Sequence, residues 1–160
     1  MTDKAATTQV YRVVIKASAQ AIWDAITKPE WTERYAYGGR AHFDLKKGGR
    51  FWHQASAEMK SVGLPDELIV GEVIESDPPR KLVISWARPK DMDDESKHSR
   101  VTFELESLND TLVKLVVIHD DLEKDPSMLN GVSNGWPLVL SNLKTFLETG
   151  RALPQNRVVA

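Results

Sequence analysis

The sequence predicts an α+β fold in which a curved antiparallel sheet grips a long C-terminal helix. Six consecutive segments in the middle of the chain alternate apolar and polar residues with a period of two, as half-buried strands do. Turns and loops join these segments, so we expect antiparallel pairing, because a parallel connection needs a long crossover. The last third of the chain repeats apolar residues at steps of three and four, which is typical of an amphipathic helix.

The chain begins with one strand and two helices before the main sheet. Residues 10–17 alternate apolar and charged side chains, which predicts a half-buried strand. Ser18 is suited to cap a following helix over 19–26. Pro29 is well placed to open a second, short helix that runs to Tyr35, because proline is tolerated in the first turn of a helix.

Residues that favour turns separate the six central strands. The first hairpin turns at 46–49 (KKGG), and 77–79 (DPP) must turn because proline cannot donate ladder hydrogen bonds. We expect 55–65 to form a polar excursion and the charged residues 90–98 to form a solvated loop. The expected strands cover 40–45, 50–54, 67–75, 81–88, 100–106 and 111–120.

A final helix is expected after a loop at 121–126, and Gly150 is a suitable residue to stop it. Its apolar stripe contains Trp136, Leu140, Leu143, Phe146 and Leu147. With no internal repeat and no linker, residues 9–153 form one domain in this prediction. We expect 1–8 to be a disordered N-terminus and 154–160 a C-terminal tail.

Composition narrows the classes of function. The formal charge of −2 comes from 21 basic and 23 acidic residues that are well mixed along the chain, whereas a nucleic-acid binder concentrates basic residues on one face. The chain has no cysteine, which removes disulfides, thiolate zinc sites and cysteine nucleophiles. It has neither an apolar signal segment at its start nor an apolar run of about 20 residues for membrane insertion. We therefore expect a cytoplasmic protein.

The motifs of metal and cofactor enzymes are missing from the sequence. No H-x-x-x-H spacing is present for a metal, no G-x-S-x-G for a serine nucleophile, and no glycine loop for a phosphate. We expect no metal and no cofactor.

The sequence resembles the START-like, or SRPBCC, superfamily, and more narrowly the bacterial homologues of the activator of heat shock protein 90 ATPase. Residues 23–30 (WDAITKPE) resemble the first helix of the superfamily. The narrower resemblance covers about residues 10 to 150 in register and depends on several features in order rather than on one. These are 44–45 (DL) before 48–49 (GG), 71–73 (GEV) before 77–79 (DPP), 117–119 (VIH), and 134–137 (NGWP) near the start of the final helix.

This resemblance implies the helix-grip fold, with about seven strands around the long helix and a cavity between them. Family members use this cavity for lipids, hormones, polyketides or other apolar molecules. The physical logic agrees, because concave volume lined by aromatic residues favours apolar ligands. The candidate cavity residues are Trp23, Trp31, Tyr35, Phe51, His53, Trp86, Phe103, Val117, His119, Trp136, Leu140 and Leu143.

Several of these residues have two interpretations. Trp23 and Trp136 lie on helical apolar faces and are also explained by core packing, while Trp31 and Tyr35 are gate candidates beside the expected cavity mouth. His119 shares the inward parity of its strand, so it is either a buried histidine satisfied by a backbone carbonyl or water, or a group that orients a ligand. The same alternatives apply to His53.

Three functions compete on the sequence alone. The leading one is non-catalytic binding of an apolar or amphipathic small molecule between the sheet and the C-terminal helix. The second is a cyclase or hydratase reaction in which His119 or His53 serves as general acid or base. The third is a stress-related interaction with a chaperone, for which we expect no partner because the chain has room only for the C-terminal-type module. A homodimer through an exposed sheet edge is possible.

Overall fold

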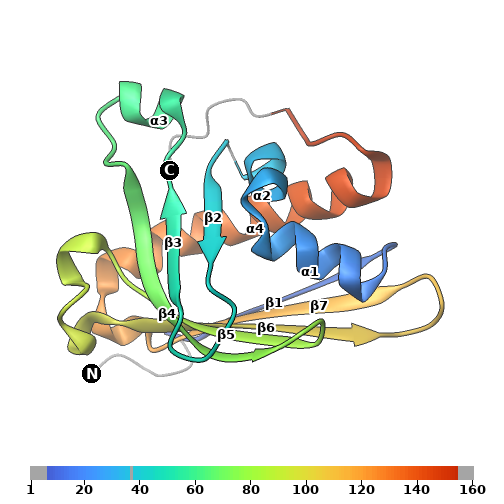
Figure 1. Cartoon of the computed structure of the whole chain (residues 1–160), viewed down its shortest axis with the longest axis horizontal. Helices are drawn as coiled ribbons and strands as arrows, with labels where there is room; N and C mark the ends of the chain where they lie inside the picture. Colours follow the sequence, from blue (N-terminus) through green and yellow to red (C-terminus); the bar gives the residue numbers. More distant parts are fainter. Residues whose placement is uncertain (1–6, 37, 155–160) are drawn as a thin grey trace.

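The computed structural model describes residues 7–36 and 38–154. Its sheet has seven antiparallel strands in the order β1-β7-β6-β5-β4-β3-β2, and the long helix α4 runs across one face of it, with α1 and α2 beside it (Figure 1). The strands are β1 (Gln9–Ile15), β2 (Arg40–Phe43), β3 (Arg50–Gln54), β4 (Glu67–Asp77), β5 (Lys81–Trp86), β6 (Ser99–Ser107) and β7 (Val113–Asp120). The helices are α1 (Ala19–Thr27), α2 (Pro29–Tyr35), α3 (Ala57–Ser61) and α4 (Pro126–Thr149), with 3₁₀ turns η1 (Pro89–Asp91), η2 (Glu95–Lys97) and η3 (Leu122–Lys124).

The predicted helix-grip architecture is confirmed, and local sequence chemistry explains where its elements begin and end. The Ser18 hydroxyl accepts a hydrogen bond from the backbone N–H of Ala21 at the start of α1, as an N-cap does. Pro29 occupies the first turn of α2. Gly150 follows α4 with φ 77°, the left-handed conformation that glycine adopts without steric cost.

Two helical segments differ from the prediction. Helix α3 lies in the stretch expected to be a polar excursion; it has no buried residue, so it leaves no amphipathic signature in the sequence. Helix α4 begins at Pro126, where the expected loop ends, but the apolar stripe that predicted the helix starts only at Trp136, because the first half is rich in serine, asparagine and glycine.

The N-terminal segment assigned to 1–8 lies mostly outside the described residues. Thr7 is described and is 1% exposed, and its backbone carbonyl accepts a hydrogen bond from the N–H of Leu122. Thr7 therefore packs against the fold two residues before β1, and disorder of the preceding residues stays a prediction. Most of the tail expected at 154–160 also lies outside the described residues.

The bend of the sheet is made in β4 at Gly71. A Cβ atom on this residue would come within 1.9 Å of the backbone carbonyl oxygen of Ser85 on β5, so only glycine fits. The Ser85 hydroxyl accepts a hydrogen bond from the next backbone N–H, that of Glu72, and the β4–β5 register shifts between Val73 and Glu75. In Figure 1, β2 and β3 run steeply across the direction of β1, β6 and β7, and this close approach lies between the two parts of the sheet.

Helix α4 is tied to the rest of the fold near both ends. At its start, the Asp125 carboxylate accepts a hydrogen bond from the N–H of Met128 and pairs with Arg88, at 2.5 Å, from the loop after β5. Near its end, the ammonium of Lys144 donates to the backbone carbonyl of Val14 in β1. Among the described residues, no helix is both long enough and apolar enough to span a bilayer.

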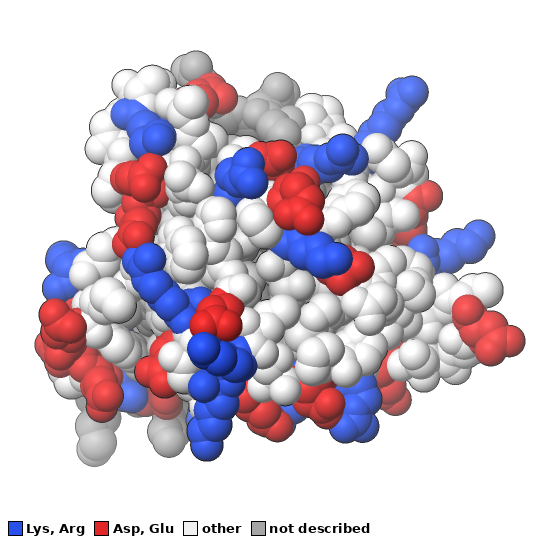
Figure 2. Space-filling view, viewed as in Figure 1, with Lys and Arg blue, Asp and Glu red and all other residues white. Residues whose placement is uncertain are grey.

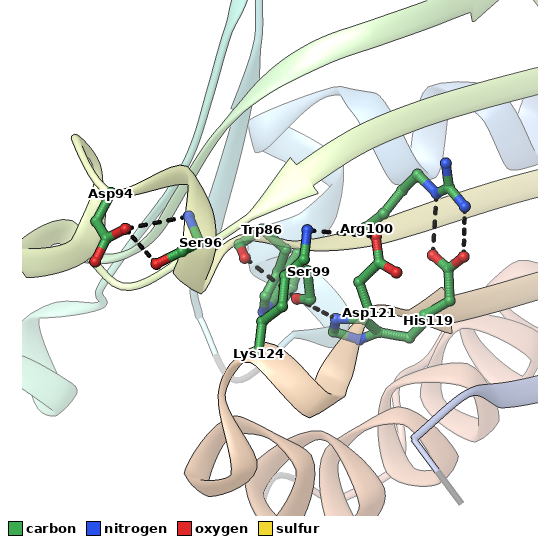
Figure 3. A network of polar contacts seen from close by, with 9 residues as sticks. Trp86, Asp94, Ser96, Ser99, Arg100, His119, Asp121 and Lys124 are labelled. Carbon is green, nitrogen blue, oxygen red and sulfur yellow. Dashed lines mark hydrogen bonds and ion pairs between the residues drawn. The ribbon is translucent and has the colours of Figure 1, made fainter. Parts of the chain in front are cut away.

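A buried hydrogen-bonded chain fastens the middle of α4 to the sheet. The indole N–H of Trp136 donates to Nδ1 of His119 on β7 at 3.0 Å. The other ring nitrogen of His119, Nε2, lies 2.8 Å from the hydroxyl of Ser99 on β6, and that hydroxyl donates to the backbone carbonyl of Trp86 (Figure 3). His119 is 0% exposed, so water does not reach the centre of this hydrogen-bonded chain.

The direction of these hydrogen bonds defines the protonation state of His119. Because the indole can only donate, Nδ1 must be the unprotonated acceptor, and the proton of the neutral ring lies on Nε2. Nε2 then donates to Ser99, which donates onward to Trp86, so each group in the chain has a partner. Burial lowers the pKa of His119 to about 4, although the neighbouring Asp120 carboxylate acts in the opposite direction.

This arrangement predicts a loss of stability in mild acid. The unfolded chain protonates His119 near pH 6.5, whereas the folded chain resists protonation until about pH 4, so stability falls as the pH decreases between these values. We expect His119 to remove about 2 kcal/mol of unfolding free energy between pH 7.5 and pH 5. Urea unfolding at both pH values should show a smaller pH dependence in His119→Gln by about this amount. Equal pH dependence in the two proteins would contradict the assignment.

Candidate functional site

A cavity of about 420 Å³ lies between the concave face of the sheet and the helices α2 and α4. All strands except β1 contribute lining residues, from Ala41 on β2 to Leu115 on β7. Helix α4 supplies the longest continuous contribution, a stripe at steps of three and four from Met128 to Leu143. The volume is within the range of sites that hold drug-sized ligands.

The cavity lining is apolar and uncharged. Among the described residues, no lysine, arginine, aspartate or glutamate lines it. Apart from the tyrosine and tryptophan rings, its polar side chains are Thr32 on α2 and His53 on β3. The Thr32 hydroxyl is already engaged with the backbone N–H of Ala41, so it completes the fold rather than facing a ligand.

An aromatic row forms the sheet side of the cavity and continues to the helix. The rings of Phe43 and Phe51 stack at 4.7 Å between centroids, and Phe51 stacks on Trp86 at 5.7 Å. Trp86 then contacts Trp136 of α4, also at 5.7 Å, and Trp136 meets Phe103 edge-on at 6.0 Å. These rings give the cavity a wall with a defined shape, which suits a flat or branched apolar molecule.

The structure brings eight of the twelve sequence-predicted residues to this cavity. They are Tyr35, Phe51, His53, Trp86, Phe103, Trp136, Leu140 and Leu143. Their role in ligand binding stays a prediction. The other four do not line the cavity: Trp23 and Val117 are buried in the core, His119 is enclosed by its hydrogen bonds, and Trp31 packs against Phe146.

The two gate candidates are placed differently from expectation. Trp31 lies 6.0 Å from the ring of Phe146 near the end of α4, and the guanidinium of Arg34 covers its ring at 5.3 Å. Tyr35 does line the cavity, but it is 4% exposed and its hydroxyl donates to the backbone carbonyl of Ala25. Burial raises the pKa of Tyr35 well above its ordinary value. Both side chains are held by contacts within the fold, so we do not assign either of them to the mouth of the cavity.

His53 is a cavity residue whose ring is held under a glycine. A Cβ atom at Gly39 would lie 2.6 Å from Nε2 of His53, so the ring occupies the space that any other residue at that position would need. Nε2 is buried and has no hydrogen-bond partner among the described residues. Burial, together with the nearby His42, lowers the pKa of His53 to about 4, so the ring is neutral at physiological pH.

The two tryptophans of the aromatic wall differ in how their N–H groups are satisfied. Trp136 donates to His119, whereas Nε1 of Trp86 is buried and has no partner within the described part of the chain. A buried donor without a partner costs about 1–3 kcal/mol. A ligand atom that accepts a hydrogen bond from Nε1 of Trp86 would therefore remove this energetic cost.

Sequence reasoning missed more than half of the lining residues, including apolar side chains such as Phe43, Leu68 and Ile69. It also missed two lining residues that have no side chain, Gly131 and Gly135 in the interior of α4. The spacing of the two glycines, four residues apart and thus on one face of the helix, was a usable signal, because glycine disfavours helix interiors.

The two candidate general acids or bases are placed differently. Both ring nitrogens of His119 are bonded inside the core, whereas His53 lines the cavity with its Nε2 unpartnered among the described residues. Among residues 7–36 and 38–154, no three histidine, aspartate or glutamate side chains gather to hold a metal ion. On the face shown in Figure 2, acidic and basic side chains are interspersed rather than collected by sign. Among the described residues, the apolar cavity is thus the main candidate for a functional site.

Solved structures support the fold and show its relatives. An HSP90 activator from Plasmodium falciparum shares 25% identity and a TM-score of 0.68, covering 88% of this chain and 96% of that one. CalU16 from Micromonospora echinospora also shares 25% identity, with a TM-score of 0.66 and coverage of 92% and 78%. An Aha1 dimer from Colwellia psychrerythraea has the same fold at 18% identity, with a TM-score of 0.70 and coverage of 91% and 98%. Comparison with curated proteins gives no match.

The family comparison agrees with these neighbours over most of the chain. The model described as "Activator of Hsp90 ATPase homolog 1-like protein" matches residues 16–148, from the end of β1 to the last turn of α4. This stretch contains the whole cavity lining. The chain therefore belongs to the family of Activator of Hsp90 ATPase homolog 1-like proteins.

Proposed function

We propose that this protein binds an uncharged apolar small molecule in the cavity between the sheet and α4. The observation that supports the proposal is the cavity itself, about 420 Å³ of space inside a well-formed core with no charged lining residue among those described. Protein interiors are normally packed with few voids larger than a water molecule, so a space of this size needs a reason. A polar or charged ligand would lose its hydration there without replacement.

The expected affinity follows from apolar burial. A ligand that buries about 400 Å² of apolar surface gains about 10 kcal/mol before the costs of association. Those costs take at least about 4 kcal/mol, which leaves about 6 kcal/mol or less and a dissociation constant of tens of micromolar or weaker. A group that accepts a hydrogen bond from Trp86 would add to this affinity.

A cavity-filling substitution tests the proposal. The probe is N-phenyl-1-naphthylamine, a neutral apolar fluorophore whose emission rises when it leaves water. We expect wild-type protein to bind it with a dissociation constant of tens of micromolar, and Ala41→Leu, which adds three carbons inside the cavity, to weaken binding at least about tenfold, a loss of about 1.4 kcal/mol.

The matched control is Ala21→Leu on α1, which makes the same chemical change away from the cavity lining. It should bind the probe as the wild type does. Absence of probe binding to the wild type, or equal binding by Ala41→Leu and the wild type, would rule the cavity out as the binding site.

Stimulation of a chaperone ATPase is a second candidate, favoured by the family description and by the Plasmodium relative. Such a role would use an outer surface rather than the cavity. Adding the protein to purified Hsp90 should leave the ATPase rate unchanged if small-molecule binding is the function. A raised rate that Ala41→Leu retains would favour the chaperone role instead.

Assembly and location stay predictions at this point. The Colwellia relative is described as a dimer, and β1 and β2 are the edge strands through which two copies of this chain would pair. Sedimentation velocity at micromolar concentration would detect such a dimer. A cytoplasmic location is likewise an expectation from the sequence.

A further inference from the structure

Two glycines in the interior of α4 have no ordinary structural reason. Gly131 and Gly135 lie one helical turn apart, and both line the cavity. Among the residues, only proline is a poorer helix former than glycine, so alanine at either position would strengthen the helix. A glycine in such a place needs a compensating use.

The two usual uses of a helical glycine do not apply here. Neither residue has a positive φ; the described glycines that do are Gly38, Gly48, Gly63 and Gly150. Nor does another element pack closely against them, because a Cβ atom built on either residue would meet nothing within 4 Å. What the missing side chains provide is open space.

The two glycines lie where the cavity lining reaches the surface of the protein. Among the described lining residues, Gly131 is the one whose own surface is exposed, and Gly135 is half-buried. On the sheet side, Leu68 and Ile69 at the start of β4 line the same cavity and are also half-buried. Tyr35, which was expected at the mouth, is 4% exposed and held by its hydrogen bond to Ala25.

We propose that Gly131 and Gly135 form a window in α4 through which an uncharged apolar ligand enters and leaves the cavity. The inference rests on the proposed function and adds the route of the ligand. The surrounding helix is suited to the role. Pro137 lacks the N–H that would bond to the carbonyl of Ser133, so the helical ladder is interrupted next to the window.

The absence of cysteine from the chain permits a reversible test within one protein. Gly131→Cys is labelled with benzyl methanethiosulfonate, which places a removable apolar group at the window. Binding and release of N-phenyl-1-naphthylamine are then followed by stopped-flow fluorescence before labelling, after labelling and after reduction with dithiothreitol. We expect labelling to slow both association and dissociation at least tenfold, with the dissociation constant changed less than threefold, and reduction to restore both rates.

The matched control is Asn134→Cys, which is exposed on the same helical segment but does not line the cavity. Labelling there should change neither rate. Unchanged association after labelling of Gly131→Cys, or equal slowing in Asn134→Cys, would overturn the window. Failure of the unlabelled wild type to bind the probe would instead overturn the proposed function, and the window with it.

Stability gives a second, independent readout. Gly131→Ala should raise the melting temperature by about 2–4 °C, because alanine favours the helix and its Cβ meets nothing. A lowered melting temperature would show that the glycine serves packing after all, and would also overturn the window.

Discussion

The fold depends on one buried contact between its helix and its sheet, the hydrogen bonds from Trp136 to His119 and on to Ser99. A helix that lies over a hollow cannot be held by close packing along its whole length. Here the ends of α4 are fixed by ion pairs and backbone contacts, and the polar chain fixes the middle at one definite height above β7. The indole of Trp136 can only donate, so it must face Nδ1 of His119, and this requirement also defines the rotation of α4 about its axis. That rotation is what turns Gly131 and Gly135 toward the cavity.

Much of the architecture could be predicted from the sequence, because alternation and turn chemistry are local. The inward parity of β7, with Val117 and His119 buried, followed directly from the charged Lys114 between apolar neighbours. Helix α3 could not be predicted, because it buries nothing and so carries no periodic signal. The first half of α4 gave no apolar stripe because it is rich in glycine, serine and asparagine, which oppose helix propensity.

The candidate site was harder to predict than the fold, since it depends on contacts between distant segments. Parity placed His119 inward correctly, but it could not show that Trp136 and Ser99, from two other elements, occupy both ring nitrogens. The expected gate at Trp31 depended on where α2 meets α4, which no local pattern reports. Conversely, the glycines of α4 were visible in the sequence, but their meaning needed the empty space beside them.

The strand order has a consequence for how the chain acquires its structure. Within the described residues, β7 is the only strand that pairs with β1, so Gln9 must find His119 across more than a hundred residues of intervening chain. The strands from β2 to β7 pair with sequence neighbours and close short loops, which is entropically cheap. During synthesis, β1 therefore has no strand partner until β7 has left the ribosome. Since contacts of long sequence separation slow folding, this pairing is expected to be the last and rate-limiting step of assembly.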